Sequence, residues 1–169
     1  KNNPLSSVTN NIENANGLRN KHYISEKQFK LEKKTVMFQN WCGLSFGKDI
    51  PNIGDVKPIN FLGLPLLIIR ENNDVINVFE NTCRHRGMQL VDSVQNSKKS
   101  LRCPYHNWCY ALDGSLIATP HIGGIGIHTH KDVNPGSFGL NKIRSYVWHD
   151  IIFINISETA KDFTEHYSQ

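Results

Sequence analysis

The sequence predicts a mainly β, antiparallel domain preceded by a helix, and three observations support this fold class. From about residue 40 to residue 157, short runs of strand-forming residues alternate with turn residues. Residues 24–41 instead carry apolar residues at helical spacing. A chain of 169 residues also buries enough surface to fold around one core without disulfides. The expected organisation is a polar arm plus helix at 1–39, a β domain at 40–157 and the start of a linker at 158–169.

The composition argues against nucleic-acid and membrane partners. The formal net charge is +4, and the basic residues are scattered rather than interleaved with aromatic residues along one stripe. No run approaches the roughly 18 apolar residues that a membrane-spanning helix needs. Residues 1–20 are rich in asparagine and lack the apolar segment of a secretory signal. Because two of its cysteines are paired with histidines, as described below, the chain is expected in the reducing cytoplasm.

The expected helix spans residues 24–41, ISEKQFKLEKKTVMFQNW. Ser25, followed three residues later by Gln28, is a capping-box signature at its start. One apolar face of this helix can be formed by Phe29, Val36 and Met37.

The β domain is expected to contain two early strands and a hairpin. The two strands are residues 61–71 (FLGLPLLIIRE) and 74–81 (DVINVFEN), joined by a polar turn at residues 72–73. Residues 107–118, NWCYALDGSLIA, form the clearest hairpin pattern in the chain. Its turn is expected to be the two-residue loop Asp113–Gly114, a type that tolerates positive φ.

The last part of the β domain is expected to be a glycine-rich loop followed by more strand. Residues 121–139 are dense in glycine and have no regular apolar period. Residues 145–157, SYVWHDIIFINIS, are mostly apolar and read as one strand or a strand pair.

Two cysteine–histidine pairs carry the chemistry. Cys83 and His85 form a C-x-H pair, and Cys103 and His106 form a C-x-x-H pair seventeen residues later. Thiolate and imidazole suit zinc, iron and copper. A structural Cys₂His₂ zinc site is one alternative, although such sites normally take one pair from a C-x₂₋₄-C or H-x₃₋₅-H motif, which these residues do not form. Mixed pairs are explained better by two metal ions, with both cysteines on one iron, both histidines on the other and two bridging sulfides.

This pattern resembles the Rieske family, whose [2Fe–2S] cluster is ligated in that way. The resemblance implies an antiparallel Rieske-type β-sandwich with a cluster-binding subdomain of two loops. It places Cys83 and Cys103 on one iron and His85 and His106 on the other. Neutral imidazoles in place of two thiolates leave the cluster less negative, which raises the potential to about −150 to +300 mV, against about −400 mV for plant-type ferredoxins.

Longer segments resemble one branch of that family, the α subunits of Rieske non-haem iron, ring-hydroxylating oxygenases. These segments are CRHRGMQL, CPYHNWCYALDGSLIATP and the upstream helix ending in FQNW, so the resemblance runs from about Tyr23 to Ser157. Respiratory Rieske subunits carry a further cysteine in each loop, where this chain has Met88 and Tyr105. The departure from the oxygenase pattern is Asn107, where glycine is frequent.

The resemblance also points to residues around the cluster: Arg84, Arg86, Tyr105, Trp108 and Tyr110. Trp108 is expected to cover the cluster beside His106. Tyr110 is expected either to hydrogen-bond toward a cluster sulfur or to be an ordinary core aromatic. Arg84 and Arg86 flank His85, so they either mark a docking place for an acidic partner or are ordinary surface arginines.

The implied function is electron transfer from a reductase or ferredoxin to a mononuclear non-haem Fe(II) that activates O₂. In the family this iron is held by two histidines and a carboxylate in a catalytic domain. The histidines at 121, 128 and 130 lie in the glycine-rich loop, where a helix carrying the paired histidines of such a site does not fit. The iron is therefore expected only in a catalytic domain after residue 169, and this chain alone is not expected to oxygenate a substrate.

The family also implies the partners. The electron acceptor is the chain's own or a neighbouring catalytic domain, and the intact parent, a mono- or dioxygenase, is expected to be a homotrimer. A stand-alone Rieske ferredoxin is the alternative. The helix at 24–41 favours the oxygenase, because a ferredoxin needs only the β domain.

Overall fold

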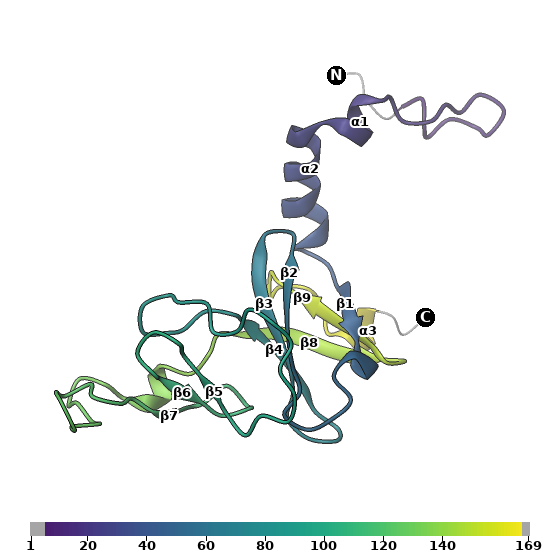
Figure 1. The fold of residues 1–169 in the computed structure, drawn as a ribbon. Coiled ribbons are helices and arrows are strands. Elements are labelled where there is room, and N and C mark those ends of the chain that lie inside the picture. The colour runs from purple at the N-terminus through teal and green to yellow at the C-terminus, as the bar shows by residue number, and fades with distance from the viewer. Residues whose placement is uncertain (1–5, 167–169) are drawn as a thin grey trace.

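The computed structural model describes residues 6–166 and confirms the mainly β, antiparallel fold. Within these residues nine strands form a six-stranded sheet, in the order β1-β9-β8-β4-β3-β2, and a three-stranded sheet, β5-β6-β7 (Figure 1). The strands of the larger sheet are β1 (Cys42–Phe46), β2 (Val56–Phe61), β3 (Leu64–Arg70), β4 (Ile76–Glu80), β8 (Lys142–Trp148) and β9 (Ile151–Asn155). Those of the smaller sheet are β5 (Leu101–Arg102), β6 (Cys109–Tyr110) and β7 (Leu116–Ala118).

The helix predicted over residues 24–41 forms over residues 26–37 only, as α2 (Glu26–Glu32) continued by a π-helical turn, η1 (Lys33–Met37). Residues 38–41 are not helical, and a further short helix, α1 (Lys21–Ile24), precedes Ser25. Ser25 has extended backbone angles, so it ends α1, and its hydroxyl accepts from Gln28 N at 3.3 Å to cap α2. The Gln28 side chain turns to Glu32 instead of back to Ser25, so only half of the predicted capping box forms.

None of the residues of α1, α2 and η1 is buried. Phe29 and Val36 of the predicted apolar face are 47% and 50% exposed. In Figure 1 the helical segment projects away from the sheets. None of the helices among residues 6–166 is long and apolar enough to cross a bilayer. The other helical turns are η2 (Gly47–Asp49), η3 (Pro135–Ser137) and α3 (Phe163–His166).

Strand β3 is buried on both faces, which explains its continuous apolar sequence. Leu66 and Ile68 face a core shared with Val78 of β4 and with Ile152 and Ile154 of β9. The alternate residues Leu67 and Ile69 face a second core, formed with the small sheet and its loops. One face of the larger sheet therefore packs on the first core, and its other face packs on the small sheet and the loops that connect it.

The prediction of one strand over residues 61–71 was wrong at its start. Phe61 ends β2, and a tight turn at Leu62 and Gly63, with φ of 52° and 91°, leads into β3. The side chain of Asn60 closes this turn by accepting from Gly63 N at 2.7 Å. The second predicted strand forms as β4 and pairs antiparallel with β3, as expected.

The predicted hairpin forms between β6 and β7, but residues 111–115 connect the strands, so the connection is longer than the predicted two-residue turn. Gly114 N donates to Ala111 O, and Ala111 N donates to Ser115 O. Of the two predicted turn residues only Gly114 has a positive φ, 86°. A Cβ at Gly114 would lie 2.4 Å from the Phe79 ring, so close packing as well as backbone conformation requires glycine here.

Residues 145–157 form the second of the two predicted alternatives, a strand pair. Strands β8 and β9 are joined by His149 and Asp150, both with positive φ, at 46° and 67°. This is the backbone of a tight two-residue hairpin turn, which asparagine and glycine normally occupy.

Candidate metal centre

The first of the two predicted ligand-bearing loops runs from Cys83 to Met88. Cys83 N donates to Met88 O at 2.8 Å, and Gly87 N donates back to Cys83 O at 3.0 Å. Gly87 closes the loop with φ of 70°, a conformation that glycine adopts without a steric cost. His85 sits at the middle of the loop and is half-buried.

The second loop, from Cys103 to Trp108, has the same backbone frame. Cys103 N donates to Trp108 O at 2.8 Å, and Asn107 N donates to Cys103 O at 3.0 Å. Asn107 stands where the first loop has glycine and has a φ of 59°. Asparagine tolerates the left-handed region better than most residues, so the departure from glycine leaves the loop intact. The two frames are equal in length, although His106 lies one position further along its loop than His85 does.

Each loop supplies one sulfur and one imidazole, and like groups of the two loops meet. The free thiols of Cys83 and Cys103 are buried side by side. Burial raises the pKa of the Cys103 thiol, and the neighbouring Cys83 adds to this effect. The His85 and His106 rings meet edge to face with their centroids 4.7 Å apart. Sulfur donors thus gather on the core side and imidazoles toward the surface.

This donor set fits a group with two metal ions. His106 Nδ1 is buried and has no hydrogen-bond partner among the described residues, whereas buried polar atoms are normally paired. Burial, and then the neighbouring His106, lower the pKa of His85, which favours the neutral ring that a metal ligand requires. In residues 6–166 no three histidine, cysteine, aspartate or glutamate side chains converge on a single metal ion. The two thiols and the two imidazoles thus lie as two pairs of like groups.

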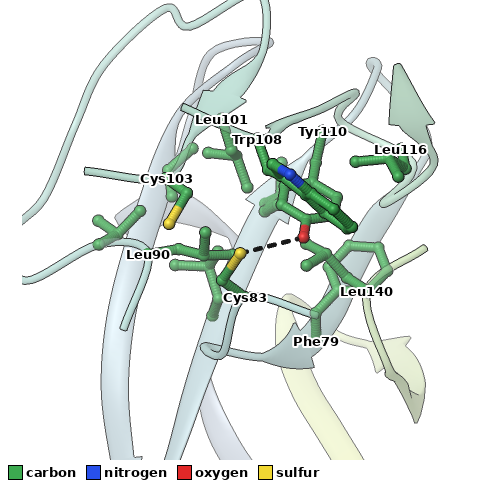
Figure 2. Close-up of a cluster of buried hydrophobic side chains, with 13 residues drawn as sticks. Phe79, Cys83, Leu90, Leu101, Cys103, Trp108, Tyr110, Leu116 and Leu140 are labelled. Atoms are coloured by element: carbon green, nitrogen blue, oxygen red, sulfur yellow. Dashed lines mark hydrogen bonds between the residues drawn. The ribbon is translucent and has the colours of Figure 1, made fainter. Parts of the chain in front are cut away.

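Tyr110 approaches the sulfur pair from β6 (Figure 2). Its hydroxyl lies 3.3 Å from Cys83 Sγ and accepts from Arg84 N at 3.0 Å. Burial, and then the Cys83 contact, raise the pKa of Tyr110 far above its usual value. The phenol therefore stays protonated and, because its oxygen already accepts from Arg84 N, its own O–H is available to the sulfur. Tyr110 is thus a buried core residue whose hydroxyl contacts Cys83 Sγ, and its action on a cluster stays a prediction.

Two further aromatic residues cover the imidazole side. Trp108 is buried and stacks on His85, with its indole 4.7 Å from that ring, rather than beside His106 as predicted. Tyr105 lies against His106, with the ring centroids 3.7 Å apart, and is 60% exposed. Phe138, which the sequence did not single out, meets Trp108 edge to face.

The predicted arginines lie at the surface of the first loop. Arg84 and Arg86 are both exposed. Backbone N–H groups of Tyr105 and His106 point at Cys103 sulfur in the second loop, and such donors favour a thiolate. The two charged arginines therefore point to solvent, whereas the groups that donate to the Cys103 sulfur are neutral backbone N–H groups.

A buried carboxylate ties the spacer between the loops to the large sheet. Asp55 is 2% exposed, and its carboxylate accepts from the backbone N–H groups of Asn52 and Ser97. Next to it, Val56 and Gln95 exchange two backbone hydrogen bonds. Sequence reasoning missed this contact because Asp55 and Ser97 are 42 positions apart.

The three histidines of the glycine-rich loop and the two other cysteines have different partners. The Nδ1 atoms of His121, His128 and His130 each accept a backbone N–H within the glycine-rich loop. Cys42 Sγ contacts Met37 O, and Cys109 Sγ contacts Ser100 Oγ. In the described chain these five residues make local contacts and lie outside the two-loop site.

A model of the Rieske [2Fe-2S] domain matches residues 40–135, which include both loops. The chain belongs to the Rieske [2Fe–2S] domain family. That family implies a [2Fe–2S] cluster.

Known Rieske oxygenases match nearly the whole chain. The α subunit of 2-aminobenzenesulfonate 2,3-dioxygenase from an Alcaligenes species is 27% identical, over 92% of this chain and 39% of that subunit. The structure of a quaternary ammonium Rieske monooxygenase superposes with a TM-score of 0.74 and 25% identity, over 86% of this chain and 38% of that one. Naphthalene 1,2-dioxygenase gives a TM-score of 0.72 and 28% identity, over 85% and 32%. The chain is thus related to Rieske oxygenase α subunits and spans two fifths or less of the length of these relatives.

Proposed function

We propose that this chain is the electron-transfer domain of a Rieske oxygenase α subunit. One observation carries the proposal: two loops of equal backbone frame bring their sulfur atoms together in the core and their imidazoles together at the surface. The match to an α subunit over 92% of the chain includes the helical segment before the β domain, which a stand-alone Rieske ferredoxin does not need.

In this proposal Cys83 and Cys103 hold one iron of a [2Fe–2S] cluster, and His85 and His106 hold the other. Such a cluster supplies reversible one-electron transfer at a higher potential than a cluster with four cysteine ligands. The protein residues provide the rest of the function. Tyr110 and the N–H groups of the second loop donate to the sulfur ligands, while the apolar core around them keeps water out.

The chain accepts electrons one at a time from a reductase or ferredoxin and delivers them to a mononuclear non-haem Fe(II) in a catalytic domain. Arg84 and Arg86, exposed beside His85, are suited to an acidic face on the electron donor. Inter-subunit electron transfer is a reported property of the quaternary ammonium Rieske monooxygenase. By analogy we propose that the acceptor iron lies in a neighbouring subunit of a homotrimer.

The first test measures metal and sulfide in anaerobically prepared protein. The proposal expects two irons and two inorganic sulfides per chain, with a rhombic EPR signal after reduction whose average g lies below the free-electron value. One zinc per chain in a colourless protein would contradict the proposal and support a structural zinc site instead.

A pair of histidine variants tests the ligand assignment. His106→Ala is expected to abolish the visible spectrum of the cluster, because one iron loses a ligand. His130→Ala is the matched control, since His130 is an exposed histidine of the glycine-rich loop. A normal spectrum in His106→Ala would remove that residue from the ligand set.

A further inference from the structure

We propose that Asn81 is a positioning residue for the two-loop site, a role that rests on the cluster function proposed above. Asn81 directly follows β4 and lies two residues before Cys83. It is 1% exposed, although it is a polar residue at the end of a strand. A polar side chain is retained in such a place only if its hydrogen bonds are satisfied.

The carboxamide of Asn81 holds the segment that leaves the first loop. Its Oδ1 accepts from the backbone N–H groups of Leu90 at 3.1 Å and Val91 at 3.0 Å. Its Nδ2 donates to Val91 O at 2.6 Å. Its own backbone N–H donates to Pro65 O at the start of β3. One residue therefore connects the large sheet to the far end of the first loop.

This connection acts on Cys83 in two ways. The bond from Cys83 N to Met88 O depends on the position of the segment that Asn81 holds. Leu90 and Val91 are buried, and both belong to the same core as the two cysteines. Figure 2 shows Leu90 beside Cys83 and Cys103. The carboxamide thus positions the hydrocarbon that separates the sulfur pair from water.

Loss of the carboxamide leaves the backbone N–H groups of Leu90 and Val91 buried without their acceptor, and Val91 O keeps only its bond from Gln89 Nε2. Such groups are costly to keep unpaired, so the segment is expected to move toward water and regain hydrogen bonds there. That movement takes Leu90 off the sulfur pair and loosens the first loop. Water and a chelator then reach the cluster more easily, and solvation favours its more negative, reduced state.

Asn155 provides a matched control because it has the same chemistry in a different place. It is fully buried at the end of β9, and its Nδ2 donates to Asn40 O at 3.1 Å. Its Oδ1 accepts from Ser157 Oγ at 3.3 Å. Its partners lie near the start of β1 and not in either loop. A substitution there removes a buried carboxamide from the fold without touching the loops.

The experiment compares Asn81→Ser and Asn155→Ser in the chain reconstituted with iron and sulfide. Both variants are expected to unfold at lower denaturant concentration than the wild type. Only Asn81→Ser is expected to lose its visible spectrum to an iron chelator about tenfold faster, from the lost hydrogen bonds. It alone is also expected to show altered EPR g values and a raised midpoint potential. If Asn81→Ser does not fold, Asn81→Asp and Asn155→Asp replace the pair, since aspartate keeps both acceptor bonds.

Two negative results are distinguishable. If the wild type incorporates the cluster, but both variants bleach at the same rate with wild-type g values and potential, Asn81 is only a structural residue and the inference fails. If the wild type itself holds no iron and sulfide, the proposed function fails first. A variant at Asn81 that folds and takes up no cluster, beside an Asn155 variant that does, supports the inference.

Discussion

The indole of Trp108 lies flat against the imidazole of His85, with the ring centroids 4.7 Å apart and the ring planes 6° apart. Phe138 meets the same indole edge to face at 5.7 Å. A residue from the second loop thus orients the histidine of the first. The two loops are therefore linked on the imidazole side by ring packing and on the core side by the sulfur pair.

Replacement of Trp108 by Ala is expected to lower the free energy of unfolding by about 3–5 kcal/mol, because it empties a large buried volume. Trp108→Phe keeps part of the stack and is expected to cost less. Urea denaturation of the metal-free protein measures both. Trp148, which is 51% exposed, is the control, and its change to Ala is expected to cost below about 1 kcal/mol. Equal losses at the two tryptophans would rule out the packing role of Trp108.

Tyr110→Phe removes only the hydroxyl that contacts Cys83 Sγ and Arg84 N. The Arg84 N–H loses its acceptor, so the free energy of unfolding is expected to fall by about 1–3 kcal/mol. In the cluster-loaded protein the lost donor to sulfur is expected to lower the midpoint potential, because the reduced cluster is the more negative state. Tyr146→Phe, at a partly exposed tyrosine of β8, is the control for both measurements. An unchanged potential in Tyr110→Phe would show that the hydroxyl does not act on the cluster.

Asn107 is expected to be sensitive to the type of side chain because of its φ of 59°. Asn107→Ala is expected to destabilise the fold by about 1 kcal/mol, since alanine pays the full cost of the left-handed region. Asn107→Gly restores the residue type of the first loop and is expected to be close to neutral. Thermal unfolding of the two variants gives the comparison. Asn96, an exposed residue without positive φ, is the control. There the alanine variant is not expected to be less stable than the glycine variant.

Acid is expected to release the spacer between the loops through Asp55. Burial opposes the ionisation of Asp55, but hydrogen bonds from Asn52 and Ser97, with the charge of Arg70, outweigh it and lower the pKa. A lowered folded-state pKa gives stability that is complete above the unfolded value, about 3.9, and is lost as the pH falls through the folded value.

Asp55→Asn is therefore expected to flatten the acid limb of the unfolding free energy measured against pH. Asp74→Asn, at an exposed aspartate, serves as the comparison. If the two variants keep the same acid limb as the wild type, hydrogen bonding at Asp55 does not depend on its charge.

Local sequence patterns identified most strands but not the turns with unusual backbone. Alternating or continuous apolar runs correctly indicated β3, β4 and the β6–β7 hairpin, since burial of those runs is a local requirement. Leu62, His149 and Asp150 have positive φ without being glycine. Leucine rarely adopts this conformation, and although aspartate and histidine adopt it more often, their residue types alone do not predict it. The pairing of the flanking strands imposes it.

The same division applies to the site. The spacing of cysteine and histidine was enough to select the four predicted ligands and the family. Asn81 and Asp55 could not be selected, because their partners lie 10 and 42 positions away and come close only in the folded chain. The stacking of Trp108 on His85 was not predicted either, because which rings meet between the two loops depends on tertiary packing.

The sulfur donors lie on the core side of the site and the imidazoles lie on its surface side, so the two sides differ in their access to solvent. Behind the thiols lie aromatic and aliphatic side chains and then a full sheet, which act as insulation. On the imidazole side, Tyr105 and the two arginines are exposed. If the chain carries electrons as proposed, this side offers the shorter path between the cluster and the surface. An electron donor and an electron acceptor would then have to use the same face of the domain, either in turn or side by side.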